Sequence, residues 1–296
     1  MTPAGWLERA VRLSARGRAA FGQTASGARD EALYLILRTL GLSLDSPASV
    51  LRRRLTAPQS AAVEGALRRR FVDKVPAAYI TGEAWLGGLR FQVDERVLIP
   101  RSYFVEILPE QVDPWVGDPR QVARVVDVCT GSGCLAVLLA RHFRGARVDA
   151  TDLMPGALEV AAANVRRHRL SGRVRLLQGD LLEPAGATRY DVILANPPYE
   201  PTAHVDRLPK EFRREPRVAL DGGRDGLEIV RRLVRQAAAH LKPRGILMIE
   251  VGGCREAFEA EFGRLEPHWF HTADGSDCVC LLQAERLALR HGRARS

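Results

Sequence analysis

The sequence predicts an α/β protein in which a small helical domain precedes a doubly wound, Rossmann-like sheet. From Arg124 onward, short apolar runs alternate with segments of helical spacing, which is typical of a parallel sheet covered by helices on both faces. The first apolar run ends in the glycine-rich loop Gly131–Gly133. Residues 1–75, in contrast, show helical spacing alone. The fold class and the domain order follow from these three observations.

Residues 1–75 are expected to form the helical domain. Apolar side chains recur at helical spacing from Leu33 to Leu40, and acidic residues precede them where the helix dipole favours negative charge. Ser46-Pro47 predicts a second helix, with serine as N-cap and proline at the first helical position. Residues 56–59, Thr-Ala-Pro-Gln, predict a third helix because they have the form of a capping box.

Residues 76–120 are expected to link the two domains. Apolar side chains alternate on either side of Gly87-Gly88, which predicts a β-hairpin with a glycine turn between residues 76 and 100. A helix is expected over residues 102–112, and a turn-rich stretch from Asp113 to Pro119 follows it.

Residues 121–296 are expected to carry the sheet. Strands are predicted at Val125–Cys129, Arg147–Asp152, Val174–Gly179, Tyr190–Ala195 and Ile246–Val251. Helices are expected between them, at about 134–143, 155–168, 225–241 and 255–265. Two final strands, near 268–273 and 277–283, predict a hairpin at one edge of the sheet.

Composition excludes several classes of protein. The chain has 296 residues, of which 46% are hydrophobic and 27% charged, as in soluble proteins with a full core. No apolar run approaches the roughly 20 residues of a membrane span, and the charged N-terminus does not read as a secretory signal, so a cytoplasmic location is expected. The five cysteines are odd in number and lack the spacing of a zinc site, so we expect buried thiols and no metal.

The net charge of +9 is concentrated at the two ends of the chain. Residues 1–75 contain 13 basic and 6 acidic side chains and residues 285–296 contain 4 and 1, whereas the stretch between them contains 27 and 28. This distribution suits an anionic partner such as RNA, whose phosphates part of each arginine triplet, Arg52–Arg54 and Arg68–Arg70, could contact. A solvated basic surface is an equal alternative, because arginine outnumbers lysine by 41 to 3, a bias that genome composition can produce.

The loop after the first strand predicts a nucleotide site. The glycines of Gly131–Gly133 let a ligand approach the backbone, and Asp152, which follows at about 20 residues, would bind a ribose. These features also fit a nicotinamide dinucleotide. Asp127 favours S-adenosylmethionine instead, because a carboxylate is unfavourable beside a pyrophosphate and favourable beside a sulfonium. Asp180 would accept a hydrogen bond from an adenine amino group while Leu181 packs on the ring.

Asn196-Pro197-Pro198-Tyr199 directly follows an apolar strand and predicts a catalytic loop. The two prolines remove backbone donors and leave carbonyl acceptors. A nitrogen placed here would donate to the Asn196 side-chain oxygen and to the Pro197 carbonyl, which turns its lone pair toward a methyl group. Tyr199 can stack on a planar amide or base. The tetrapeptide therefore predicts methyl transfer to an amide or amino nitrogen.

Together, these motifs resemble the HemK-like class I S-adenosylmethionine-dependent methyltransferases, which modify the side-chain amide of glutamine. The resemblance covers essentially the whole chain and is closest at residues 84–102, Asp127–Cys134 and Leu208–Pro216. The Leu208–Pro216 segment resembles the branch that methylates the third protein of the large ribosomal subunit. The sister branch, which methylates peptide-chain release factors, differs there.

The resemblance implies a helical substrate-docking domain, a hairpin linker and a seven-stranded methyltransferase domain with one antiparallel strand. It implies that the cofactor S-adenosylmethionine is bound by Asp127, Thr130, Gly131, Ser132, Gly133, Asp152, Leu153, Asp180, Leu181 and Asn196. It assigns Asn196, Pro197, Pro198 and Tyr199 to the target glutamine. Glu200-Pro201 and Gly252-Gly253-Cys254 depart from the usual family pattern, and neither is expected to touch the cofactor or the amide.

The expected substrate is a glutamine of that ribosomal protein, either free or in an assembling particle with RNA nearby, and no membrane partner is expected. Four alternatives remain open at this stage. A release-factor methyltransferase would share nearly every motif, whereas a nucleic-acid adenine methyltransferase would need a target-recognition segment. A nicotinamide-dependent oxidoreductase would leave Asn196–Tyr199 without a role, and a catalytically silent ribosome-assembly factor would bind no cofactor.

Overall fold

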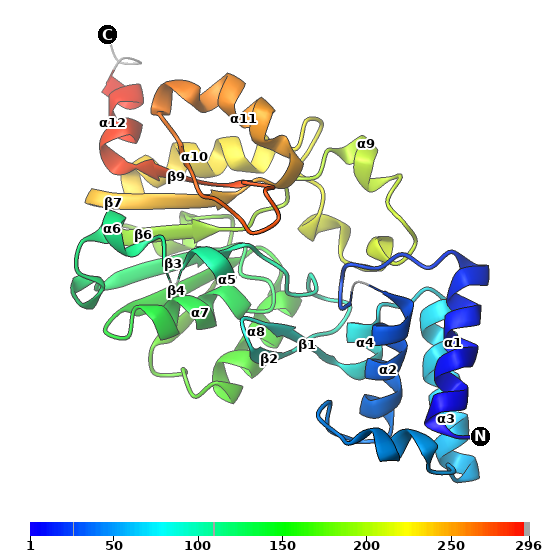
Figure 1. Cartoon of the computed structure of the whole chain (residues 1–296). Coiled ribbons are helices and arrows are strands. Elements are labelled where there is room, and N and C mark those ends of the chain that lie inside the picture. The colour runs from blue at the N-terminus through cyan, green and yellow to red at the C-terminus, as the bar shows by residue number, and fades with distance from the viewer. Residues whose placement is uncertain (26, 109, 293–296) are drawn as a thin grey trace.

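Figure 1 shows the computed structural model, in which a bundle of helices lies at one end and a large sheet with helices on both faces forms the rest. The structure describes residues 1–25, 27–108 and 110–292. A small two-stranded hairpin lies between the two parts. The expected α/β class and the helical N-terminal region are confirmed. Within the described residues, no helix combines the length and the apolar character that a membrane crossing requires.

Three longer helices form the N-terminal bundle, α1 (Pro3–Gly17), α2 (Ala28–Thr39) and α3 (Ala57–Phe71). Their apolar faces meet in a core that contains Trp6, Leu35 and Leu67. Helical spacing of apolar residues was sufficient to predict this bundle, because each helix buries one face against the other two.

The ends of these helices test two capping predictions. The capping box is present at α3, where the Thr56 hydroxyl accepts from the Gln59 N–H at 3.3 Å. The prediction for Ser46-Pro47 is wrong, because the segment that follows is the short 3₁₀ helix η1 (Ala48–Arg52), with Pro47 itself at the N-cap and no side-chain cap. Proline therefore occupies the position that the serine was expected to fill.

The hairpin pairs β1 (Glu83–Leu86) with β2 (Leu89–Gln92) and follows the short helix α4 (Ala77–Thr81). Gly87 and Gly88 connect the strands with φ of +56° and +72°, which suits the two-residue turns that favour positive φ. Behind the hairpin, the buried Asn164 side chain accepts from the Gln92 N–H at 2.7 Å and donates to the Gln92 carbonyl at 2.9 Å. The predicted hairpin is confirmed and is hydrogen-bonded to the sheet-bearing part.

The prediction of one helix over residues 102–112 is wrong. Two one-turn helices replace it, α5 (Phe104–Ile107) and α6 (Asp113–Val116), and the 3₁₀ turn η2 (Pro119–Gln121) follows them. The chain has proline at position 109, which offers no N–H to continue a helical ladder, and Asp113-Pro114 starts a new turn.

Seven strands form one sheet in the order β5-β4-β3-β6-β7-β9-β8. Their bounds are β3 Arg124–Val128, β4 Arg147–Asp152, β5 Val174–Gln178, β6 Tyr190–Ala195, β7 Leu241–Glu250, β8 His268–Trp269 and β9 Val279–Gln283. β9 runs antiparallel to both neighbours, and the remaining pairs are parallel. The expected strands, the single antiparallel strand and the edge hairpin are confirmed.

Two strand boundaries differ from the prediction by more than two residues. β7 begins at Leu241, before the expected Ile246, because Leu241 pairs with Tyr190 across an irregular register. β8 has two residues instead of the predicted 268–273. The Asp277 carboxylate accepts from the Thr272 N–H at 2.8 Å, and such side-chain bonds to the backbone compete with strand pairing.

Helices cover both faces of the sheet (Figure 1). One face carries α7 (Cys134–His142) and α8 (Pro155–Arg167), and the other carries α10 (Glu228–His240), α11 (Arg255–Phe262) and α12 (Ala284–Gly292). β3 lies between β4 and β6, so the order of the parallel strands reverses there. Open α/β folds bind ligands at the carboxyl edge of the sheet at such a point.

α12 was not predicted, since residues 285–296 were interpreted as a basic tail for an anionic partner. Leu287 is 1% exposed and packs in the core between the sheet and α10. Arg286 forms an ion pair with Glu266. Part of the tail is therefore folded onto the sheet, and residues 293–296 lie outside the described residues.

Candidate functional site

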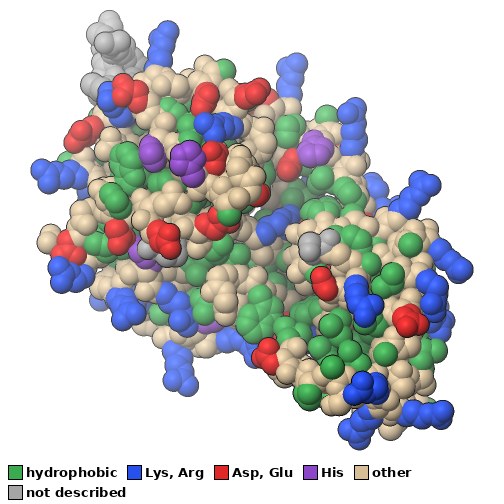
Figure 2. Space-filling view, viewed as in Figure 1, with side chains coloured by type: hydrophobic (Ala, Val, Ile, Leu, Met, Phe, Trp, Pro, Cys, Tyr) green, Lys and Arg blue, Asp and Glu red, His purple; other side chains and the backbone are tan. Residues whose placement is uncertain are grey.

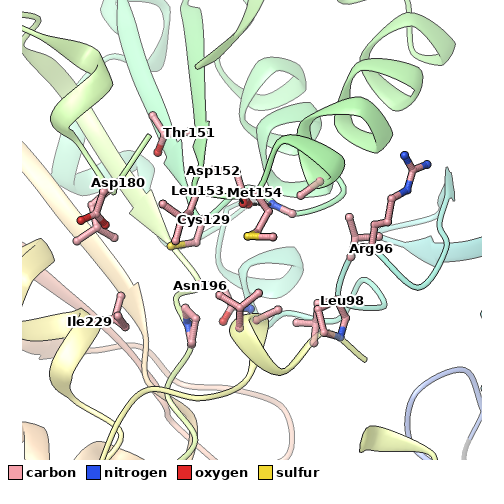
Figure 3. A pocket seen from close by; sticks show the side chains of 18 of the residues that line it. Arg96, Leu98, Cys129, Thr151, Asp152, Leu153, Met154, Asp180, Asn196 and Ile229 are labelled. Atoms are coloured by element: carbon pink, nitrogen blue, oxygen red, sulfur yellow. Dashed lines mark hydrogen bonds between the residues drawn. The ribbon is translucent and has the colours of Figure 1, made fainter. Parts of the chain in front are cut away.

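A cavity lies at the carboxyl edge of the sheet, where β3, β4 and β6 end (Figure 3). The space between its walls, including the open mouth, is about 790 Å³. Predicted residues that line it are Gly131, Asp152, Leu153, Asp180, Leu181, Asn196 and Pro198. In Figure 3, Asp180 and Ile229 lie on one side, Arg96 and Leu98 on the opposite side, and Asn196 between them.

The glycine-rich loop forms one wall of the cavity. Gly133 precedes α7 with φ of +78°, and a Cβ there would lie 3.1 Å from the Cβ of Ala161 on α8. Gly131 has φ of +53° and no atom within 4 Å of its Cβ position. Gly133 therefore allows close packing of the two helices, whereas Gly131 keeps backbone open toward the cavity.

Asp152 holds this loop from the end of β4. Its Oδ2 accepts from the Gly131 N–H at 2.8 Å, and its Oδ1 accepts from the Met154 N–H at 2.9 Å. Burial raises the pKa of the carboxyl group, and the two N–H donors oppose that shift. Each carboxylate oxygen has a second lone pair, so Asp152 can still accept from a ligand hydroxyl.

Asp127, Thr130, Ser132 and Gly133 do not line the cavity but lie beneath it. Asp127 is fully buried in β3, and its Oδ2 accepts from the Thr130 hydroxyl at 2.5 Å. Burial raises the pKa of Asp127 to about 7, although the Thr130 hydroxyl opposes the shift. The Ser132 carbonyl accepts from Asn164 at 2.9 Å. These groups support the loop and place negative charge below it when Asp127 is ionised.

The wall opposite Arg96 and Leu98 contains Leu181, Ile229 and one ion pair. Asp180 pairs with Arg232 of α10, so its carboxylate is not free in this state of the site. Leu181 is 5% exposed and adopts a positive φ of +52°, which is uncommon for a branched residue and places its side chain in the wall. Ile229 lies beside this wall in Figure 3.

The Asn196–Tyr199 loop closes the cavity from the end of β6. The Asn196 Nδ2 group donates to the Arg101 carbonyl at 3.4 Å. Asn196 and Pro198 line the cavity, whereas Pro197 is buried and does not. The structure therefore brings the predicted catalytic loop and the glycine-rich loop to one cavity.

Tyr199 packs against the segment that follows β7. Gly252 has φ of +48°, and a Cβ there would come within 2.3 Å of the Tyr199 ring. The Cys254 thiol donates to the Tyr199 carbonyl at 3.2 Å. Gly252 and Cys254 therefore contact the predicted amide-binding loop at Tyr199 and set its position, although no contact of theirs with the amide itself was expected.

Several lining residues were not predicted. Thr151 and Met154 lie on either side of Asp152, and Cys129 directly follows β3 with φ of +61°, so proximity to the motifs could have identified them. The Thr151 hydroxyl is buried without a hydrogen-bond partner among the described residues. Leu98, Val218 and Ile229 come from distant segments and carry no local signal. The other four cysteines are buried, as expected.

The Leu208–Pro216 segment connects the helical bundle to the catalytic loop. Glu211 is 2% exposed and accepts from the Ala20 N–H at 3.1 Å. Glu215 is 3% exposed, and its two oxygens accept from Gln23 at 2.5 Å and from Arg101 at 2.9 Å. Since the Arg101 carbonyl in turn accepts from Asn196, the segment links the bundle to the cavity.

The arginine triplet Arg68–Arg70 is divided in the structure. Arg68 and Arg69 are exposed, but Arg70 is 1% exposed and its guanidinium donates to Glu31 at 2.6 Å and to Glu211 at 3.3 Å. Arg70 therefore does not belong to the part of the triplet that could contact phosphate. Arg52–Arg54 are exposed, and Figure 2 shows basic side chains standing out around the rim of the bundle.

Comparison with known proteins gives three findings. Residues 105–267 match the family model of the methyltransferase small domain. The chain is 48% identical over 270 residues to the ribosomal protein uL3 glutamine methyltransferase of Bordetella pertussis, covering 91% of each chain. It is 44% identical over 288 residues to the protein of the same name from Burkholderia pseudomallei, covering 95% of this chain and 94% of the relative.

Among solved structures, the catalytic domain of hMettl16 in complex with a 3′-UTR hairpin is similar to this chain. The TM-score is 0.50 at 18% sequence identity, with 79% of this chain and 84% of the other covered. A likeness at this identity concerns the fold alone.

Proposed function

Because this chain belongs to the family of the ribosomal protein uL3 glutamine methyltransferases, we propose that it methylates the side-chain amide nitrogen of one glutamine in uL3, with S-adenosylmethionine as methyl donor. The observation that carries the proposal is the position of Asn196 at the end of β6, on the cavity that the glycine-rich loop borders. The amide acceptors and the cavity bordered by the glycine-rich loop share one edge of the sheet.

The cavity suits S-adenosylmethionine better than a dinucleotide. Asp152 offers carboxylate lone pairs for a ribose, and the unpartnered Thr151 hydroxyl lies beside it. Among the described lining residues, Arg232 is paired with Asp180 and Arg96 with Asp94, so neither cation is free for a pyrophosphate. The carboxylates of Asp127 and Asp152 favour a cationic ligand instead.

We assign the parts of the cofactor to the residues that the sequence motifs indicate. Gly131, supported from beneath by Asp127, Thr130, Ser132 and Gly133, would hold the methionine part, and Asp152 would hold the ribose. Leu153 and Leu181 would cover the adenine. Asp180, which stays paired with Arg232, would accept from the adenine amino group through a remaining carboxylate lone pair. When bound, S-adenosylmethionine supplies an electrophilic methyl group on a sulfonium sulfur.

The chain's own groups then act on the glutamine. An amide nitrogen is a weak nucleophile because its lone pair is delocalised. The Asn196 side-chain oxygen and the Pro197 carbonyl would accept its two N–H bonds, which aligns the nitrogen and stabilises the positive charge that develops on it. Tyr199, held by Gly252 and Cys254, would restrain the plane of the amide. After transfer the surplus proton leaves to water, so no general base is required.

The helical bundle, residues 1–75, would dock the protein substrate, residues 76–120 would connect it, and residues 121–296 would carry the reaction. We place the reaction in the cytoplasm, on uL3 alone or in an assembling particle. The exposed Arg52–Arg54 and Arg68 and Arg69 would contact RNA of such a particle, and binding to it should then weaken with salt.

The test is intact-mass analysis of purified uL3 and of a peptide-chain release factor after incubation with the enzyme and S-adenosylmethionine. We expect one added methyl group on uL3, mapped to a glutamine, and none on the release factor. The reverse pattern would assign the enzyme to release factors. Methylation of neither protein would reopen nucleic-acid methylation and a non-catalytic role in ribosome assembly.

Asp152→Ala is expected to raise the dissociation constant for S-adenosylmethionine about 10- to 100-fold, because hydrogen bonds to a charged group contribute about 1.5–3 kcal/mol. The Gly131 N–H would also lose its acceptor. Isothermal titration calorimetry measures the change, with the exposed Glu256→Ala on α11 as control. A dissociation constant within twofold of wild type would contradict the role of Asp152.

A further inference from the structure

Glu250 is a buried acid beside the catalytic loop that no motif singled out. It is the last residue of β7 and is 3% exposed. In the parallel pairing of β6 with β7, Ala195 lies opposite Ile249, so the next residues along, Asn196 and Glu250, leave neighbouring strands at the same edge. Burying a carboxyl group without hydrogen-bond partners costs free energy, so the contacts of Glu250 indicate its role.

Two donors hold one oxygen of this carboxyl group. Its Oε2 accepts from the Ser102 hydroxyl at 2.6 Å and from the Tyr103 N–H at 3.2 Å. The Ser102 hydroxyl itself accepts from the Phe104 N–H at 3.1 Å, so its own proton is directed to Glu250. These bonds fix the carboxyl group as an acceptor.

The Asn196 side-chain amide meets two acceptors. Its Nδ2 group donates to the Arg101 carbonyl at 3.4 Å. Arg101 directly precedes Ser102, whose hydroxyl donates to Glu250, and the Asn196 amide opposes the rise in the pKa of Glu250. If the amide were rotated by half a turn, its oxygen would face a carbonyl and a carboxylate. Its NH₂ group would then face the cavity, where it could not accept from a glutamine N–H.

We propose that Glu250 is a positioning residue, whose carboxylate holds the Asn196 side chain with Nδ2 toward the protein and Oδ1 toward the substrate amide. The inference rests on the proposed methylation of glutamine. Glu250 does not line the cavity, so it acts through Asn196 and not on the cofactor.

The groups around Glu250 set its charge state. Burial raises its pKa to about 7, and Ser102, the Tyr103 N–H, Arg101 and Asn196 oppose the shift. Tyr199 and Cys278 also face it, and its charge contributes to raising the pKa of each of them. Protonation of Glu250 adds a donor where Asn196 needs an acceptor, so the hold on Asn196 weakens as the pH falls through 7.

The chain contains only two asparagines, Asn164 and Asn196, which permits a direct test by NMR. Protein labelled with ¹⁵N at asparagine alone shows two side-chain NH₂ groups. In the wild type we expect the Asn196 signals to shift with pH around 7 and the Asn164 signals to stay constant. In Glu250→Gln the pH response of Asn196 should disappear.

Asp127, whose pKa is also raised to about 7, is unchanged in Glu250→Gln. A pH response of Asn196 that survives in this variant therefore overturns the proposal. Should Glu250→Gln not fold, Ser102→Ala serves instead. Because it removes one donor to the carboxylate, it should move the midpoint of the Asn196 response to higher pH, and an unchanged midpoint would count against Glu250.

Kinetics provide the second readout. Glu250→Gln is expected to lower kcat about tenfold and to leave the dissociation constant for S-adenosylmethionine unchanged. In an Asn196→Ala background, Glu250→Gln should lower kcat less than twofold, because its effect passes through Asn196. A tenfold decrease in kcat caused by Glu250→Gln in the Asn196→Ala background would overturn the proposal. If wild-type enzyme methylates neither protein, the proposed function fails, while the NMR experiment still tests the contact.

Discussion

Asn196→Ala is expected to lower kcat about 10²- to 10³-fold, the loss of about 2.7–4 kcal/mol of transition-state stabilisation that removal of one preorganised polar group produces. The truncated side chain cannot accept from the target amide, whose nitrogen then loses both alignment and a negative dipole. The dissociation constant for S-adenosylmethionine should stay within about threefold, because the substitution leaves Asp152 and Leu181, the proposed cofactor contacts, unchanged.

Steady-state transfer of labelled methyl groups to uL3, together with calorimetry of cofactor binding, measures both effects. Glu200→Gln is the matched control. Glu200 lies in the same loop and accepts from His204 at 2.5 Å, but no general base is needed, so near-normal kcat is expected. A decrease of less than threefold in Asn196→Ala with cofactor binding intact would refute the role of Asn196.

Arg70→Ala is expected to lower the free energy of unfolding of the helical bundle by about 3–5 kcal/mol, the range found when one partner of a buried ion pair is removed. Arg70 is 1% exposed and faces Glu31 and Glu211, which are equally enclosed. Its guanidinium also donates to the Ala20 carbonyl at 2.6 Å. Without Arg70, two carboxylates are left in a buried site with Lys74 as their remaining cation.

Urea unfolding followed by circular dichroism measures this loss, and the exposed neighbour Arg69→Ala should change stability by no more than about 0.5 kcal/mol.

The loss of stability in Arg70→Ala should depend on pH. Burial already raises the pKa of Glu31, and Arg70 opposes that shift, so its removal raises the pKa further. An acid with a raised pKa destabilises the fold as the pH rises. The loss should therefore grow between pH 5 and 8, and a loss below about 1 kcal/mol at pH 8 would contradict the assignment.

Much of the fold could be predicted from local patterns. The strand Tyr190–Ala195 was predicted with its bounds, and the hairpin turn at Gly87-Gly88 was placed correctly. Alternating and helical spacings report which face of an element is buried, and that information is present in a short window of sequence. The same holds for the loop Gly131–Gly133 and for Asn196–Tyr199, which the structure brings to one cavity.

The sequence-based predictions failed where a contact between distant segments determines the local structure. Residues 285–292 were interpreted as a basic tail, yet Leu287 anchors them to the core. The contact of Cys254 with Tyr199 was not part of any prediction, because it joins residues 55 positions apart and no spacing rule indicates it. The early start of β7 likewise depends on pairing with Tyr190.

The sequence by itself determined the order of helices and strands, the family and the two loops that meet at the cavity, because these depend on short-range periodicity and on contiguous motifs. Only the tertiary structure decided which charged residues are buried. Arg70 meets Glu211 across 141 positions, and Glu215 meets Arg101 across 114. A charged side chain is stable inside a protein only when a partner is brought to it, and that partner is supplied by the fold and not by its sequence neighbours.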